Sequence, residues 1–92
     1  MAPDQLLDRV VDKSSFIAFV EALAAERREA EQLERDHPLK YQLGGALNWH
    51  NGTISSFLEA ALECFEDPAA NEHPNPSWRL FAEFLYCGKI IE

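Results

Sequence analysis

The sequence has few basic residues relative to its acidic ones. Lysine and arginine together number 8, against 16 aspartates and glutamates, which gives a formal net charge of −8. Domains that bind nucleic acid concentrate lysine and arginine on one face. Anionic membrane surfaces likewise attract clusters of basic residues. The charge balance therefore predicts neither nucleic acid nor a membrane as a partner, and it favours a partner protein with a basic surface.

Long apolar runs are also missing. The most apolar stretch, residues 76–91, is shorter than the roughly twenty residues that a membrane-spanning helix needs. The first residues, Met1 to Asp4, lack the basic start and the apolar run of a secretory signal. We therefore expect a cytoplasmic protein.

Cysteine is scarce, with only Cys64 and Cys87 in the chain. They fall on different predicted helices and form no C-x-x-C pair. Cysteines of cytoplasmic proteins are usually reduced and pack as small apolar residues. We therefore expect two free thiols that are slow to react.

The residue patterns that indicate catalysis or cofactor binding are absent as well. The three histidines, His37, His50 and His73, fall in predicted loops, and none has a helical spacing to another metal ligand. The Gly44–Gly45 pair is not followed by the lysine and serine or threonine of a phosphate-binding loop. The sequence predicts no metal, no cofactor and no catalytic residue, so we expect that the protein is not an enzyme.

What the sequence does contain is strong helical periodicity, first of all in its last segment. In residues 76–91, apolar side chains recur at helical spacing on two sides, and a helix that is apolar nearly all round has neighbours on several sides. The two stripes are Trp78, Phe81, Ala82 and Leu85, and Leu80, Phe84, Cys87 and Ile91. Asn75 is the expected cap and Pro76 the first helical residue. We expect this helix at the centre of the fold, with Trp78 in the core.

A longer helix is predicted over residues 14–36, after the capping side chains that begin at Asp12. Its first half carries an apolar stripe from Phe16 to Leu23, whereas the half from Glu26 onward is highly charged. That second half has two interpretations. It is either a solvated extension or a contact arm for a partner or a second copy of the chain.

A third helix is predicted over residues 53–65, capped by Asn51 or Thr53, and a short one from Pro3 to Val10. The intervening residues 37–52 are irregular. In this segment Leu39, Tyr41 and Leu43 alternate as in a short extended piece, and Leu47 and Trp49 are the residues expected to tie it to the core.

One surface feature suggests binding. Glu59, Glu63 and Glu66 recur at steps of four and three on one helical face, and Asp67 follows. Like charges at this spacing disfavour an isolated helix slightly. The acidic face is either a solvated surface or a patch that steers the protein toward a basic partner.

Several short stretches resemble a family of small bacterial proteins of unknown function. They are the runs from Ser15 to Val20, Trp49 to Ile54, Phe57 to Ala61, Pro76 to Ala82, and Lys89 to Glu92. The family pattern ends in Ile-Tyr-Glu, whereas this chain has Ile91 at the tyrosine position. The resemblance implies a small helical domain in a bacterial cytosol, with no assigned catalytic residues.

Together these patterns predict one all-α domain over residues 1–92. Its main helices span about 14–36, 53–65 and 76–91, with the first two packed on opposite sides of the third. The favoured function is a non-enzymatic protein-binding module of the inhibitor or immunity type, with Glu59, Glu63, Glu66 and Asp67 as candidate contacts for a basic partner. The alternative is a structural or regulatory homodimer that uses the charged half of the first long helix.

Overall fold

The computed structural model describes residues 1–42, 44–66 and 75–91, and in these residues every regular element is a helix. Four α-helices and one short 3-10 helix follow each other along the chain. They are α1 (Pro3–Leu7), α2 (Lys13–Asp36), η1 (Ala46–Asn48), α3 (Ile54–Glu66) and α4 (Trp78–Ile90). The predicted all-α fold is confirmed, and each long helix lies within two residues of its predicted bounds.

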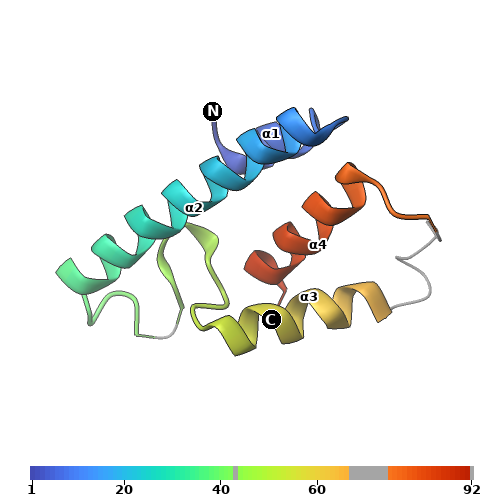
Figure 1. Cartoon of the computed structure of the whole chain (residues 1–92). Helices are drawn as coiled ribbons and strands as arrows, with labels where there is room; N and C mark the ends of the chain where they lie inside the picture. Colours follow the sequence, from blue (N-terminus) through green and yellow to red (C-terminus); the bar gives the residue numbers. More distant parts are fainter. Residues whose placement is uncertain (43, 67–74, 92) are drawn as a thin grey trace.

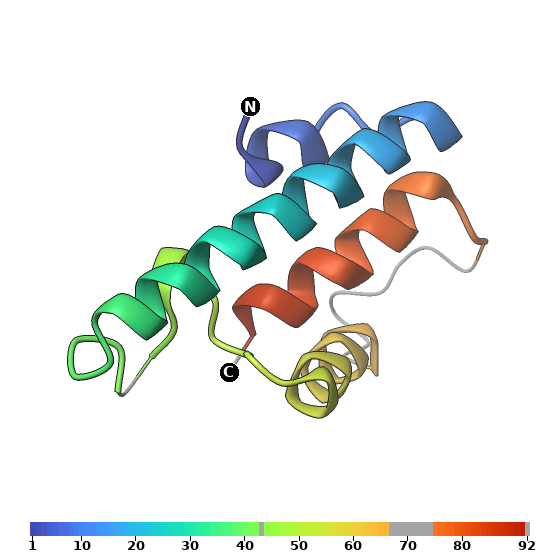
Figure 2. The same cartoon turned by 60° about the vertical axis from the view of Figure 1, so that its left-hand side comes forward.

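Helix α4 lies at the centre. It packs most extensively on α3 and also contacts α2 and α1, and Figure 2 shows it between α2 and α3. Helix α1 lies against α2, and Figure 1 shows α2 and α3 at opposite edges of the molecule. The prediction that two long helices flank the C-terminal helix is therefore confirmed.

Side-chain caps fix where the helices begin. Asp12 caps α2, because its carboxylate accepts a 2.8 Å hydrogen bond from the Ser15 amide. Thr53 caps α3 in the same way, since its Oγ1 accepts from the Ser56 amide at 3.1 Å. The predicted cap of α4 was wrong: Ser77, rather than Asn75, accepts a hydrogen bond from the Leu80 amide at 3.0 Å.

The core forms where α2 meets α4, α1 and the segment before α3. Its largest fully buried side chain is Phe19, and Leu23, Ala82 and Trp49 lie around it. Trp78 was expected in this core, but 37% of its surface is exposed. It lies in the first turn of α4 and contacts Phe16 at a ring distance of 5.4 Å.

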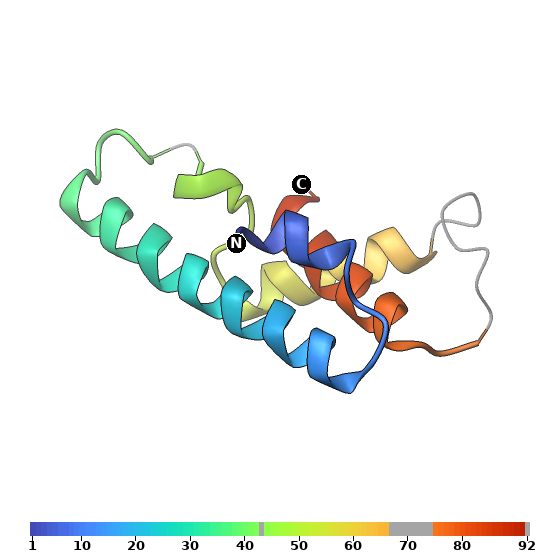
Figure 3. The same cartoon turned by 90° about the horizontal axis from the view of Figure 1, so that it is seen from above.

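The second half of α2 does not project into solvent. Ala30 is fully buried, and η1 packs against α2 there. Figure 3 shows the chain after α2 folding back beside that half of the helix. The predicted solvated extension is therefore wrong for one face of this half, where Glu26, Arg27 and Glu34 contact the returning chain. The opposite face, which carries Arg28, Glu29, Arg35 and Asp36, is exposed as predicted.

That returning chain is not extended as predicted. The amides of Lys40 and Tyr41 both donate to the His37 carbonyl, which makes a turn directly after α2. Leu43 lies outside the described residues. Leu47 is 39% exposed and does not tie the segment to the core, whereas Trp49 is buried and does. Leu47 and Asn48 both have positive φ angles, 56° and 65°, which few residues other than glycine adopt.

The contact between α3 and α4 is close because Gly88 has no side chain. A Cβ at this position would lie 2.8 Å from the ring of Phe57, well inside contact distance. Within the described residues, no helix combines the length and the apolar content needed to cross a membrane.

Candidate functional site

The most concentrated polar chemistry of the described residues lies around Trp49. The Trp49 indole Nε1 donates a 3.0 Å hydrogen bond to Oε1 of Glu26. The same oxygen lies 2.5 Å from Nζ of Lys89, a residue that is 5% exposed. A buried charge is tolerated when it is paired and hydrogen-bonded. The Glu26–Lys89 pair joins α2 directly to the last turn of α4, and the Trp49 hydrogen bond ties the segment before α3 to the same carboxylate.

The Lys89 ammonium also lies over aromatic rings, which adds a favourable cation–π contact. It is 5.7 Å from the centre of the Trp49 ring and 5.8 Å from that of Tyr86. Burial raises the pKa of the Tyr86 hydroxyl, and the negative charges of Asp4 and Glu26 raise it further. Tyr86 therefore stays neutral beside Lys89 at ordinary pH.

Arg27 covers Trp49 from α2, with its guanidinium 5.3 Å from the ring centre. Its Nη1 lies 3.1 Å from Oε2 of Glu34, and its Nε lies 3.3 Å from Oε1 of Glu31. Glu34 also accepts from the Ala46 amide at 3.1 Å. Because two carboxylates already neutralise Arg27, this cluster is not a free anion-binding site.

Asn51 fastens the chain to the end of α4. Its Nδ2 donates to the carbonyls of Gly88, at 2.9 Å, and Ile91. The neighbouring His50 amide donates to the Lys89 carbonyl at 3.0 Å. These bonds satisfy carbonyls that a helix end leaves without partners. Asn51 therefore caps the end of α4. Of the two residues predicted to cap the start of α3, Asn51 and Thr53, it is Thr53 that does so.

A cleft of about 240 Å³ opens beside this cluster, between α2 and the start of α3. Its lining is mostly apolar, with charged groups from α2 at one side. The residues that line it are Arg27, Glu31, Trp49, Asn51, Gly52, Thr53, Ile54, Phe57 and Leu58. An apolar cleft with a few fixed polar groups is a typical ligand-binding feature.

The outer face of α3 extends this cleft as an exposed apolar stripe. Ile54, Leu58 and Leu62 are four residues apart, so they lie in one row. They are 82%, 50% and 53% exposed. Isolated apolar residues on a surface are ordinary, whereas a row that adjoins a cleft is a feature of binding surfaces.

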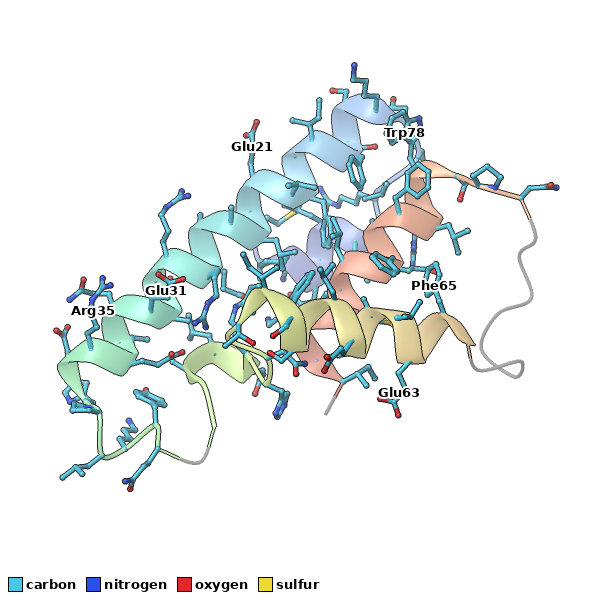
Figure 4. The ribbon with its side chains drawn as sticks, turned by 60° about the horizontal axis from the view of Figure 1, so that its bottom comes forward. Glu21, Glu31, Arg35, Glu63, Phe65 and Trp78 are labelled. Atoms are coloured by element: carbon cyan, nitrogen blue, oxygen red, sulfur yellow. A yellow bond between two sulfur atoms is a disulfide. The ribbon has the colours of Figure 1, made fainter. Side chains whose placement is uncertain are left out.

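The predicted acidic face lies beside this stripe. Glu59 and Glu63 are exposed on α3, and Figure 4 shows Glu63 pointing away from α2. The side chain of Glu66 and the whole of Asp67 lie outside the described part of the chain. Sequence reasoning identified the carboxylates but missed the leucines next to them, because a leucine in a helical pattern is usually assigned to the core.

A second aromatic surface lies at the other end of the molecule. Phe16, Trp78 and Phe81 form a triangle with ring distances between 5.4 and 6.4 Å. Phe81, like Trp78, is exposed, and Figure 4 shows Trp78 at the end of α4 away from the cleft. These rings partly cover each other, so they are less available to a partner than the α3 stripe.

The expectation of two free thiols is corrected by the structure. Cys64 of α3 and Cys87 of α4 form a disulfide, with their Cα atoms 6.3 Å apart. The packing of α3 on α4 places the two residues side by side, and their Cα separation is in the range that disulfides span. Their spacing in the sequence gave no sign of this, because the helix-to-helix register is a tertiary property.

Among the residues that the structure describes, no three histidine, cysteine, aspartate or glutamate side chains lie close enough together to hold a metal ion. His37 ends α2 through its backbone amide, and His73 lies outside the described residues. Comparison of the chain with known protein-family models, with curated proteins and with solved structures gave no match. The family resemblance therefore stays a prediction, and the function must be argued from geometry.

Proposed function

We propose that this protein is a non-enzymatic protein-binding module, of the inhibitor or immunity type, that covers a basic surface of its partner. One observation carries the proposal: the outer face of α3 exposes the apolar row Ile54, Leu58 and Leu62 directly beside the carboxylates Glu59 and Glu63. Protein interfaces combine an apolar centre with a polar rim in this way. The apolar row supplies area to bury, and the carboxylates select the charge of the partner.

The overall charge supports the same partner. A formal net charge of −8 on 92 residues creates a field that attracts basic proteins and accelerates encounter with them. Exposed carboxylates contribute mainly to the association rate, and salt screens them over about 8–10 Å. The module should therefore bind its partner faster at low salt.

The homodimer alternative depended on a free charged arm in the second half of α2. In the structure Arg27 and Glu34 of that half are engaged with each other, with Trp49 and with the Ala46 amide. The exposed residues of that half are all polar, so they offer no apolar area for a dimer to bury. The homodimer is therefore not carried forward as a second function.

The test compares two double variants that change the net charge equally. Glu59→Gln with Glu63→Gln neutralises the proposed surface, while Glu21→Gln with Glu29→Gln neutralises two exposed carboxylates of α2. Figure 4 shows that Glu21 points away from α3. A protein captured from host lysate at low salt is identified by mass spectrometry, produced in pure form, and its association rate is measured over a salt series.

We expect the α3 variant to associate more slowly and to lose most of its salt dependence, and the α2 variant to behave like the wild type. The two variants should share the wild-type circular dichroism spectrum, since all four side chains are exposed. Equal rates and equal salt slopes for both variants would show that net charge alone, rather than this face, governs association. The proposal would then be wrong.

The cytoplasm is proposed as the place where this module acts, as the sequence predicts. The Cys64–Cys87 disulfide is the feature that opposes this location, because structural disulfides are rare in reducing compartments. Alkylation of thiols in intact cells before lysis separates the two cases. Two alkylated cysteines support the cytoplasm, and a pair protected until reduction contradicts it.

A further inference from the structure

The cleft beside Trp49 and the apolar row of α3 are one continuous surface. Ile54 and Leu58 line the cleft and also begin the exposed row that ends at Leu62. At 1.5 Å per residue, the row from Ile54 to Leu62 is about 12 Å long, and the cleft lengthens it toward Trp49. We call this surface the α3 track.

The shape of the α3 track fits one class of ligand. An amphipathic helix binds to an apolar groove through side chains at i, i+3, i+4 and i+7, which cover two turns. Two turns of helix span about 11 Å, close to the length of the exposed row. The cleft, with a volume of about 240 Å³ and a mostly apolar lining, has room for a single apolar anchor on the ligand helix.

The charges on both edges of the α3 track have the same sign. Glu31 of α2 lies at the cleft with its side chain 47% exposed, and Glu59 and Glu63 follow the outer edge of α3. Arg27, the basic residue of the cleft, is neutralised by Glu31 and Glu34. A ligand helix on the track therefore meets Glu59 and Glu63 on one flank and, at the cleft end of the other flank, the half-exposed Glu31, which is paired with Arg27.

A second copy of this chain is a poor ligand for the α3 track. Two α3 tracks placed face to face would bring Glu59 and Glu63 of each copy toward the acidic edges of the other, and like charges across an interface oppose association. A ligand with lysine or arginine on both flanks of its apolar stripe has the opposite charge pattern.

We propose that the α3 track binds a basic amphipathic helix of another protein, with one apolar side chain inserted in the cleft formed by Arg27, Trp49 and Leu58. This inference rests on the proposed protein-binding function and specifies the chemistry of the partner. It differs from that function in the surface it requires, because a basic partner could also bind the carboxylates without entering the cleft.

The probe for the test is a synthetic 15-residue helical peptide with leucine at i, i+4, i+7 and i+11 and lysine on both flanks. One control peptide has the same composition in scrambled order, and another has glutamate in place of lysine. Binding to the ¹⁵N-labelled full chain is followed by backbone amide shifts in NMR spectra. We expect shifts at Gly52, Leu58 and Leu62 with the first peptide, and none of comparable size with either control peptide.

Matched variants locate the binding surface. Leu58→Ser with Leu62→Ser removes apolar contact from the track, whereas Val11→Ser with Leu39→Ser removes two residues that are 80% and 82% exposed elsewhere. We expect the first pair to weaken binding by about tenfold or more, since each leucine loses a buried side chain in the complex. The second pair should leave the affinity unchanged, and all four sites are exposed enough for folding to survive.

The outcomes distinguish this inference from the proposed function. Peptide shifts confined to Trp78 and Phe81, or equal loss of affinity in both leucine pairs, would overturn the α3 track. Equal binding of the lysine and glutamate peptides would overturn the charge selectivity of the track. The absence of lysine-peptide binding at millimolar concentration would overturn the α3 track as a binding surface. The glutamate-to-glutamine comparison of association rates decides the protein-binding function separately, whatever the peptide does.

Discussion

Lys89 of α4 and Glu26 of α2 form a buried ion pair, with Nζ 2.5 Å from Oε1. Trp49 donates to the same carboxylate oxygen, so one glutamate holds the last turn of α4 and the segment before α3 against α2. Neither residue stood out in the sequence. A lysine near the end of a helix is usually solvated, and Glu26 opens a charged stretch that contains three other glutamates.

The first prediction concerns this pair. Lys89→Ala should lower the free energy of unfolding by about 3–5 kcal/mol, because it leaves a partly buried carboxylate without its cation. Arg79→Ala is the control, since Arg79 pairs with Glu83 and Asp8 at the surface. Exposed pairs contribute only about 0–1 kcal/mol. Urea unfolding followed by circular dichroism measures both, and equal losses in the two variants would contradict a buried role for Lys89.

The second prediction concerns the aromatic core. Phe19→Ala should cost about 3–5 kcal/mol, because it empties a fully buried site that its neighbours cannot refill. Trp78→Ala should cost less, although the side chain removed is larger, because Trp78 lies at the surface and solvent occupies the space. Thermal unfolding compares the two variants. A larger loss for Trp78→Ala would restore the sequence-based expectation that Trp78 is the main core residue.

The sequence predicted the helices well and their exposed faces poorly. Helix positions follow from local information such as the apolar period of α3 and the capping side chain of Asp12. Which side of a helix is covered depends on its neighbours. Leu58 and Leu62 fit an apolar period as well as any core residue, yet no element of the described chain covers them.

One part of the candidate site could be predicted from the sequence and the other could not, because only the first part depends on local pattern. The exposed carboxylates Glu59 and Glu63 could be predicted from their charge and helical spacing. The cleft could not, because it requires Arg27 and Leu58 to meet across two helices that are distant in the sequence. The strongest sequence signal for it was Trp49, a large aromatic residue in an otherwise irregular segment.

The third prediction concerns the pH dependence of the free energy of unfolding, to which the Asp12 cap of α2 contributes. Hydrogen bonds from the Ser15 amide and then its hydroxyl hold the pKa of Asp12 below its ordinary value. A lowered folded pKa stabilises the fold above the ordinary aspartate pKa, and this contribution is lost as the pH falls through the folded pKa. Stability should therefore decline below about pH 4.

Asp12→Asn isolates the charge, because asparagine still caps a helix. This variant should show a flatter decline of unfolding free energy between about pH 4 and pH 2, measured by urea unfolding at each pH. Ser15→Ala should flatten the decline as well, since it removes the hydroxyl bond, while Ser14→Ala serves as a neighbouring control. An unchanged slope in Asp12→Asn would show that other carboxylates account for the acid sensitivity.

The last prediction concerns the disulfide between Cys64 and Cys87, which closes a loop with a sequence separation of 23 residues. In the chain-entropy description, a bond across a loop of this size stabilises the fold by about 3 kcal/mol. Reduction, or replacement of both cysteines by serine, should lower the free energy of unfolding by about that amount. Helix α3 should be affected most, because its main packing partner is α4.

Amide hydrogen exchange of the oxidised and reduced protein tests where the stabilisation acts. We expect faster exchange in α3 after reduction, with little change around Phe19 and Leu23, because that part of the core lies between α2, α1 and α4. The double serine variant is the control for effects of the reductant itself. If exchange rises equally in every helix, the disulfide stabilises the whole fold cooperatively. Reduction would then destabilise the α3 track and the core to the same extent.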